Sequence, residues 1–237
     1  MKGFTLVEIS IVLAILALLI GGMLIPISAQ IEQQKITDTQ NSIDLVKEAL
    51  TGYAVANGYL PCPAISATNG SEDRTSGACN KRTGFVPWVA LGTPQLDSWG
   101  HLFHYSVSPN FSNANQSISL TSSRDITILT RMPGAANLVA LSNCNDIPAV
   151  VLSHGKDGFG ATNAQGIAQV SPPAQNVDEI TNTGGAVASP PCGASNYFVS
   201  RTQVSDSSTS GGAFDDIVDW ISPYVLFDRM VSGGKLP

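Results

Sequence analysis

Apolar residues are concentrated at the start of the chain. From Ile9 to Ile27 no residue is charged, and at about 1.5 Å of rise per residue a helix of this length can span a bilayer. Further along, apolar positions continue at helical spacing, and these are Ile36, Ile43, Val46, Leu50, Tyr53 and Ala54. The pattern predicts one long helix from near Phe4 to about Ala56. Residues 4–27 are expected to form a transmembrane segment, and residues 28–57 an amphipathic continuation that packs on a globular domain.

Helix-weakening residues interrupt the apolar half. Gly21, Gly22 and Pro26 lie within six positions of one another, and proline removes a backbone donor while paired glycines weaken a helix. We expect a kink or a locally unwound stretch near residues 21–26. The alternative is that a membrane helix tolerates these residues without a break.

The pattern changes after residue 57 to short apolar runs separated by turn residues, as is typical of β-strands. "SISLTSSRDITILTRM" and "IPAVVLSHG" predict strands, and "IPAVVLS" is apolar enough to lie in the centre of a sheet. Residues 66–84 predict a polar loop, and the tail "ISPYVLFDRMVSGGKLP" predicts a short helix. The chain is therefore expected to be α+β, with the long helix packed on a small antiparallel sheet in a β-rich domain over residues 58–237.

Composition and cysteine usage indicate an extracytoplasmic domain. Charged residues make up only 13% of the chain, and the net charge of −6 disfavours nucleic acid as a partner. An even number of widely spaced cysteines beyond a membrane segment indicates two disulfides in an oxidising compartment. Of three possible pairings we prefer the two that close the nearer loops, with four buried free thiols as the alternative. The preferred pairs are Cys62–Cys79 and Cys144–Cys192.

About the first 30 residues carry a family resemblance. "KGFTLVEISIVLAILALLIGGMLIP" resembles the N-terminus of type IV pilins and type II secretion pseudopilins. The resemblance implies a pilin-like fold, a leader of residues 1–3, and a prepilin peptidase that cuts between Gly3 and Phe4 and methylates the new terminus. Pro26 lies one position later than the usual family proline.

Glu8 is the acid at the head of the apolar run, where a carboxylate is costly in hydrocarbon. The resemblance makes it the family's glutamate. After cleavage the amine of Phe4 in one subunit and the carboxylate of Glu8 in a neighbour could neutralise each other and fix the stagger between subunits. The alternative is an interfacial acid that reaches the membrane surface without a partner.

Two internal stretches, "QLDSWGHLFHYSV" and "SHGKDGFGATN" with the later "FDDIVDW", are similar to the major pseudopilin. That similarity implies a calcium-binding loop with Asp157 and Asp216 as the matching acids. Residues 160–212 depart from the family as a loop-rich insertion of which Cys192 ties down one end, and the alternative to calcium is a glycine turn with a helix capped by Asp215 or Asp216. His101 and His104 have an offset that places them on opposite faces of a strand, so no metal role is expected for them.

These observations predict a structural protein and not an enzyme. The expected function is a subunit of a type II secretion pseudopilus or a type IV pilus, polymerised through its N-terminal helix. The expected partners are other pilin or pseudopilin subunits, the prepilin peptidase and the inner-membrane assembly platform, with the N-terminus cytoplasmic and the C-terminal domain periplasmic. The alternative is a membrane-anchored periplasmic enzyme or binding protein.

Overall fold

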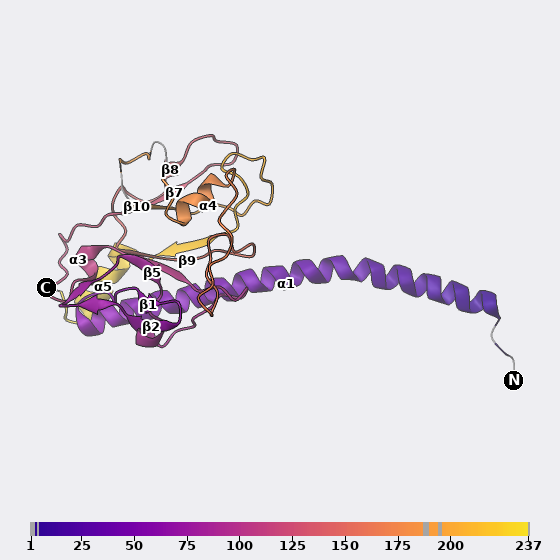
Figure 1. Cartoon of the computed structure of the whole chain (residues 1–237), viewed down its shortest axis with the longest axis horizontal. Helices are drawn as coiled ribbons and strands as arrows, with labels where there is room; N and C mark the ends of the chain where they lie inside the picture. Colours follow the sequence, from indigo (N-terminus) through magenta and orange to yellow (C-terminus); the bar gives the residue numbers. More distant parts are fainter. Residues whose placement is uncertain (1–2, 4, 187–189, 194–195, 237) are drawn as a thin grey trace. The chain divides into compact units, whose positions relative to one another are not determined.

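The computed structural model describes residues 3, 5–186, 190–193 and 196–236, and for residues 20–26 it describes the backbone only. The chain divides into two compact units, Met1–Asp38 and Thr39–Pro237. Helix α1, Leu6–Asn57, contains every described helical residue of the first unit and opens the second (Figure 1). The predicted long helix is confirmed to within about two residues at each end.

The backbone of α1 stays helical through residues 20–26. The locally unwound stretch that we expected there is therefore wrong. The physical reason is that a proline removes a single backbone donor, and the turns on either side can keep their own hydrogen bonds.

The end of α1 buries one stripe in the second unit. Ile43, Val46, Leu50 and Ala54 are each at most 1% exposed, and their spacing of three or four residues places them on one helical face. The amphipathic pattern is thus confirmed. The neighbouring Tyr53 is half-buried, and its hydroxyl donates a hydrogen bond to Glu72 Oε1 at 3.2 Å.

A four-stranded antiparallel sheet forms the centre of the second unit. Its order is β11-β9-β6-β5, with β5 at Thr83–Phe85, β6 at His104–Val107, β9 at Ala149–Ser153 and β11 at Ile217–Trp220. All five residues of β9 are buried. The predicted central position of "IPAVVLS" is confirmed, because β9 is paired on both sides.

A second sheet of three strands covers one face of the first. Its order is β10-β7-β8, with β7 at Ile126–Thr130, β8 at Val139–Ala140 and β10 at Asn196–Val199. One buried cluster joins the two sheets, and it contains Ile126, Ile128, Ile147, Val150, Leu152, Phe198 and Val218. The small antiparallel sheet that we expected is the four-stranded one, whereas in the second sheet β10 runs parallel to β7. Parallel pairing is possible here because a long connection separates the two strands.

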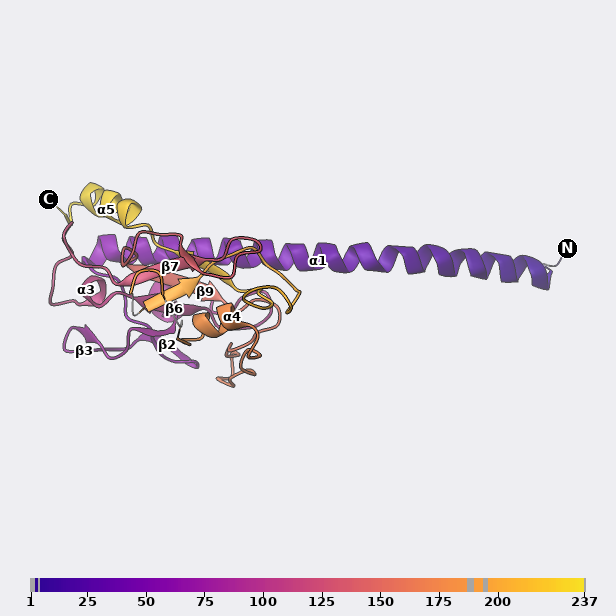
Figure 2. The ribbon, with the colours of Figure 1, turned by 90° about the horizontal axis from the view of Figure 1, so that it is seen from above.

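The second unit has three layers, which Figure 1 shows as the end of α1, then β5 and β9, then β7, β8 and β10 with helix α4, Val177–Asn182. Figure 2 shows the same helix α1 running beside β6 and β9 from another direction. Residues 160–212, expected to be a loop-rich insertion, contain both α4 and β10. The insertion is therefore part of the folded domain, because its strand and helix complete the outer layer.

Short elements replace the polar loop that we expected at residues 66–84. Four small strands lie there or at its edge, namely β1 at Ala64–Ser66, β2 at Asn69–Glu72, β3 at Arg74–Thr75 and β4 at Ala78–Cys79. They pair as two antiparallel hairpins, β1 with β2 and β3 with β4. Sequence periodicity misses strands of this length, because two to four residues do not show an alternation.

Three further helices complete the described part of the chain. They are α2 at Trp88–Leu91, α3 at Pro109–Ser112 and α5 at Pro223–Ser232. In α5 the apolar residues divide, since Leu226 and Met230 are fully buried while Tyr224 is 72% exposed. The predicted C-terminal helix is confirmed, but only part of its apolar set faces the core.

Candidate functional site

Thr5 and Glu8 cap the N-terminal end of α1 by bonding to each other. Glu8 Oε2 accepts one hydrogen bond from the Thr5 backbone N–H and one from the Thr5 hydroxyl, each at 2.8 Å. In return the Glu8 N–H donates to Thr5 Oγ1 at 3.3 Å. This arrangement is a capping box, which the Thr-x-x-Glu spacing before an apolar run signals in sequence. It gives Glu8 a partner within its own chain that we did not expect.

The predicted cleavage position lies just before this cap. Gly3 is exposed and outside the helix, and a side-chain carbon added to it would meet no atom within 4 Å. Phe4 lies outside the described residues. The position of Gly3 leaves its backbone accessible to an enzyme.

The surface that follows the cap is apolar on all sides. Every described side chain from Leu6 to Leu19 is exposed, and several of these are large, including Leu6 at 88% and Leu18 at 78%. A helix that is apolar all round requires an apolar environment. Within the part of the chain that the structure describes, no helix meets the length and hydropathy needed to cross a membrane. The predicted transmembrane segment 4–27 includes Phe4 and the side chains of residues 20–26, which are outside that part.

A cluster of three carboxylates lies in the second unit. Asp157 follows β9, Glu179 lies on α4 and Asp215 precedes β11, and one carboxylate oxygen from each lies within 4.8 Å of the others. Asp157 is exposed, Glu179 is buried and Asp215 is half-buried. Three segments that are distant in sequence therefore bring their acids to one place.

Backbone donors hold the cluster in position. The Asp157 N–H donates to Asp215 Oδ2 at 2.8 Å, and the Asp215 N–H donates to Glu179 Oε1 at 3.2 Å. Asn176 Nδ2 donates to Glu179 Oε2 at 2.7 Å. Asp215 Oδ1 is buried without a hydrogen-bond partner among the described residues. Burying an oxygen without a hydrogen bond costs free energy. A cation that binds this oxygen would recover that free energy.

Burial and mutual repulsion raise the pKa values of two of these acids. Burial, followed by repulsion from Asp157, raises the pKa of Asp215 to about 8. Burial also raises the pKa of Glu179 to about 7. A bound cation would remove the repulsion, and carboxylate oxygens are the ligands that hard cations such as Ca²⁺ prefer. The residues present therefore fit a calcium ion chemically.

The glycine after His154 is required for this geometry. Gly155 has a φ of +62°, and a side-chain carbon there would lie 2.4 Å from the Asp215 carbonyl oxygen. Only glycine permits both the left-handed backbone and the close approach. The loop after β9 can thus reach the segment that precedes β11.

Asp216 is not one of these three clustered acids, and its pairing with Asp157 at a calcium ion stays a prediction. Asp216 is buried on the other side, where Asn182 Nδ2 donates to its Oδ2 at 2.7 Å and His154 Nδ1 lies 3.4 Å from its Oδ1. Adjacent residues of an extended segment point in opposite directions, and for this reason Asp215 takes the expected place. Glu179 was missed because it lies in the insertion, and no ligand spacing in the sequence links it to Asp157.

Two histidines, the buried His154 and the half-buried His104, pack against each other near the cluster. His104 Nδ1 and His154 Nε2 lie 3.3 Å apart, and the rings meet edge to face with centroids 4.6 Å apart. Burial lowers the pKa of His104 to about 3 and that of His154 to about 4. Both imidazoles are therefore neutral at physiological pH.

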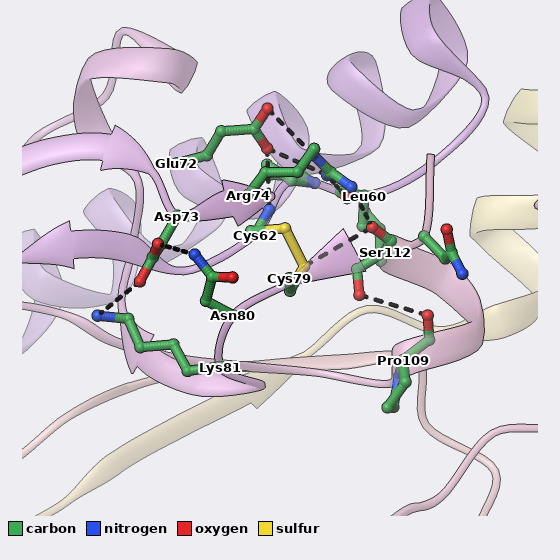
Figure 3. Close-up of a disulfide and its surroundings, with 12 residues drawn as sticks. Leu60, Cys62, Glu72, Asp73, Arg74, Cys79, Asn80, Lys81, Pro109 and Ser112 are labelled. Carbon is green, nitrogen blue, oxygen red and sulfur yellow. Dashed lines mark hydrogen bonds and ion pairs between the residues drawn. A yellow bond between two sulfur atoms is a disulfide. The ribbon is translucent and has the colours of Figure 1, made fainter. Parts of the chain in front are cut away.

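The Cys62–Cys79 disulfide joins the segment between α1 and β1 to strand β4 (Figure 3). Beside it Glu72 Oε2 accepts hydrogen bonds from the Cys62 N–H and from Arg74 Nη2, each at 3.1 Å. The Arg74 guanidinium also donates to the Ser112 carbonyl at 2.6 Å. The disulfide and this half-buried ion pair hold the β1–β4 region against the rest of the domain.

The second disulfide joins Cys144 to Cys192, with Cα atoms 5.6 Å apart and a sequence separation of 48. These two disulfides are the pairs that we preferred from the sequence. Cys192 lies in the insertion and Cys144 lies between β8 and β9. The bond therefore attaches the insertion covalently to the central sheet region.

A family model matches the first residues of the chain. Residues 1–24 match the model described as the prokaryotic N-terminal methylation motif, which is the signature of type IV pilins and pseudopilins. The resemblance is thereby confirmed for this segment, which covers 24 of the 237 residues. No curated protein and no solved structure matches the chain. The motif implies a pilin-like substrate of a prepilin peptidase, and it indicates a structural protein.

Proposed function

We propose that this protein is a structural subunit of a type II secretion pseudopilus or a type IV pilus. A prepilin peptidase cuts Gly3–Phe4 and methylates Phe4, and the mature chain polymerises through its N-terminal helix. The observation that supports this proposal is the methylation motif over residues 1–24, which includes the apolar helical surface from Leu6 to Leu19. Before assembly the subunit is anchored in the inner membrane with its C-terminal domain in the periplasm, where both disulfides are stable.

The capping box suggests how Glu8 takes part in assembly. Both Thr5 donors reach Oε2, and no hydrogen bond reaches Oε1 among the described residues. The second oxygen is therefore available to the amine of Phe4 in a neighbouring subunit. Thr5 would orient the carboxylate, and the neighbour's charge would fix the stagger between subunits.

Mass spectrometry of the mature protein tests the proposal. The expected product begins at N-methyl-Phe4, and assembled protein that retains Met1 would contradict it and leave an anchored periplasmic protein as the explanation.

Gly3→Val is a suitable variant, because the structure has open space around Gly3. Uncut Gly3→Val with an intact fold would show that the peptidase recognises this position. A deletion strain scored for secretion and for piliation then distinguishes the two filament types.

We also propose that a calcium ion joins α4 to the loops around β9 and β11. The support is the close approach of carboxylate oxygens from Asp157, Glu179 and Asp215, together with the orphaned Asp215 Oδ1. The ion would be structural, since it links the insertion to the central sheet.

A further inference from the structure

A buried carboxylate outside the acid cluster is bonded to the loop that follows β9. Asp97 lies between α2 and β6, its side chain is fully buried, and it is not one of the three clustered acids. Its Oδ2 accepts a hydrogen bond from the hydroxyl of Ser153 at 2.6 Å. Its Oδ1 accepts the backbone N–H groups of Trp99 and His101 at 2.9 and 2.8 Å. Both oxygens of Asp97 are therefore held by groups of its own unit.

The Ser153 hydroxyl links Asp97 to the backbone of Gly155. Ser153 is the last residue of β9 and is fully buried. A serine hydroxyl has one proton to donate and two lone pairs that accept. Because the proton is directed at Asp97, the lone pairs are left for the Gly155 N–H, which donates to Ser153 Oγ at 3.1 Å. Asp97 thus sets the direction of the hydroxyl, and the hydroxyl holds Gly155.

The position of Gly155 decides how two of the clustered acids meet. A side-chain carbon on Gly155 would lie 2.4 Å from the carbonyl oxygen of Asp215 and 2.7 Å from its Oδ1. Two residues further on, the Asp157 N–H donates to Asp215 Oδ2 at 2.8 Å. Since Gly155 and Asp157 both contact the same aspartate, a shift of Gly155 would separate the two carboxylates.

The His101 ring supports the same loop from another side. A side-chain carbon added to Gly158 would lie 2.5 Å from His101 Cε1, so the ring packs directly against the residue that follows Asp157. His101 is held in turn by Asp97, which accepts its N–H and whose Oδ2 lies 3.7 Å from its Nδ1. Asp97 is therefore connected to the loop on both sides of Asp157, at Gly155 through the serine hydroxyl and at Gly158 through the imidazole.

We propose that Asp97 and Ser153 are positioning residues for the cation site. The carboxylate orients the serine hydroxyl, and the hydroxyl holds the loop after β9 where Asp157 meets Asp215. This inference rests on the calcium ion proposed above and assigns the groups that set the geometry of its ligands. Neither residue is a ligand itself. Removal of a group that orients metal ligands from outside typically weakens metal affinity by about 10–100-fold.

Amide hydrogen exchange on the full-length chain in detergent, with a chelator present, tests the positioning without the ion. Ser153→Ala removes the hydroxyl and leaves the backbone of β9 in place. The Asp157 amide, measured relative to the amides of β7, should then exchange at least about tenfold faster than in the wild type. Wild-type exchange of this amide in Ser153→Ala would overturn the proposal.

Ser106→Ala is the matched control for Ser153→Ala. Ser106 is a buried serine on β6 of the same sheet, and its hydroxyl lies 3.0 Å from Thr83 Oγ1 and not beside the loop. Ser106→Ala should lower the melting temperature and leave the relative exchange of the Asp157 amide unchanged. Equally fast exchange in both variants would show a general loss of stability and would also overturn the proposal.

Calcium titration calorimetry on the same proteins tests the consequence for the ion. Ser153→Ala should raise the dissociation constant for Ca²⁺ more than about tenfold, whereas Ser106→Ala should leave it within about twofold of the wild type. A dissociation constant that is unchanged in folded Ser153→Ala would refute the positioning role. A wild type that binds no Ca²⁺ would instead refute the ion, and the exchange measurement would still decide whether Ser153 holds the two acids together.

Asp97→Asn tests the carboxylate and replaces Ser153→Ala if that variant does not fold. The amide group keeps an acceptor for the backbone N–H groups but presents a donor to Ser153, so the serine proton loses its acceptor. The Asp157 amide should exchange faster and calcium should bind more weakly, both by less than in Ser153→Ala. Wild-type behaviour of folded Asp97→Asn in both measurements would show that Asp97 does not orient the hydroxyl.

Discussion

The carboxylate of Glu8 accepts two hydrogen bonds from Thr5, one from its backbone N–H and one from its hydroxyl. An acid at the head of an apolar helix therefore has a structural role within the single chain, because it satisfies a backbone donor at the helix end. The assembly role that we propose for Glu8 does not compete with this one. The two roles use different oxygens of the same carboxylate.

Variants at these two residues separate helix capping from assembly. Glu8→Ala should insert and be cut normally, since it makes the segment more apolar, but it should join filaments poorly because the neighbour's Phe4 amine loses its partner. Glu8→Lys should be worse, because two positive groups would then meet. The measurement is the amount of each variant in filaments relative to its membrane pool. Normal incorporation of Glu8→Ala would show that Glu8 is not an assembly contact.

The Thr5 hydroxyl can be tested in the same assay. Thr5→Ser keeps the hydroxyl and should assemble like the wild type, whereas Thr5→Val removes it at nearly constant shape and should reduce incorporation several-fold. The reason is that Thr5→Val loses the hydroxyl bond to Glu8 Oε2 and the acceptor for the Glu8 N–H. Equal incorporation of the two variants would argue against orientation of Glu8 by Thr5.

Calcium should stabilise the wild-type chain. At a ligand concentration about a hundredfold above the dissociation constant, the free energy of unfolding should rise by about 2.7 kcal/mol, which a chelator should reverse. Asp157→Asn and Glu179→Gln should each abolish most of this response. Thermal unfolding with and without Ca²⁺ is the measurement.

Asp216→Asn is the matched control for the cation site. Asp216 is adjacent to Asp215 but faces Asn182, so this variant should lower the melting temperature and still respond to calcium. A lost response in Asp216→Asn with a retained response in Glu179→Gln would restore the ligand set that we expected from the sequence. A wild type without any calcium response would refute the ion altogether.

Both disulfides should be found by peptide mapping under non-reducing conditions. Their closed segments differ in length, with sequence separations of 17 and 48 residues. In the chain-entropy account the disulfide that closes the longer segment raises the free energy of unfolding by about 4 kcal/mol, and the other raises it by about 3 kcal/mol. Chemical denaturation of Cys144→Ser/Cys192→Ser and Cys62→Ser/Cys79→Ser compares them. A crossed pairing in the map would refute the connectivity.

The pair of His104 and His154 should make the fold sensitive to acid. The folded-state pKa values of His104 and His154, about 3 and about 4, lie below the unfolded value of about 6.5. The unfolded chain therefore binds protons first as pH falls, and stability that is present above about pH 6.5 is lost below it. On acidification from about pH 7 to about pH 5, each histidine should lower the free energy of unfolding by about 2 kcal/mol.

Comparing His104→Phe with the wild type isolates this effect, because the carboxylates are the same in both proteins. The loss of melting temperature on acidification should be smaller in His104→Phe. His101→Phe is a control of opposite sign, since Asp97 raises the pKa of His101 and that histidine stabilises the fold more at low pH. An unchanged pH profile in His104→Phe would mean that His104 is not buried and neutral.

Local patterns were sufficient for the N-terminal segment and for the elements with strong periodicity. The Gly3-Phe4 processing motif is a linear signal, and the buried stripe from Ile43 to Ala54 follows from 3.6-residue periodicity alone. The central strand β9 could also be predicted, because a strand covered on both faces must be apolar throughout. All of these depend on neighbours within a few turns or on a single run of residues.

The carboxylate cluster and the histidine pair depend on distant parts of the chain. Asp157 meets Asp215 across 58 residues, Asp215 meets Glu179 across 36, and His104 meets His154 across 50. Whether Asp215 or Asp216 faces the cluster depends on the register in which β11 pairs with β9, since a shift of one residue exchanges the two faces. That register is fixed by burial of Val218 against the outer sheet, and α4 reaches the cluster only because β10 pairs with β7. Such long-range pairing has no local signature, because it is set by which apolar faces cover one another once the whole chain has folded.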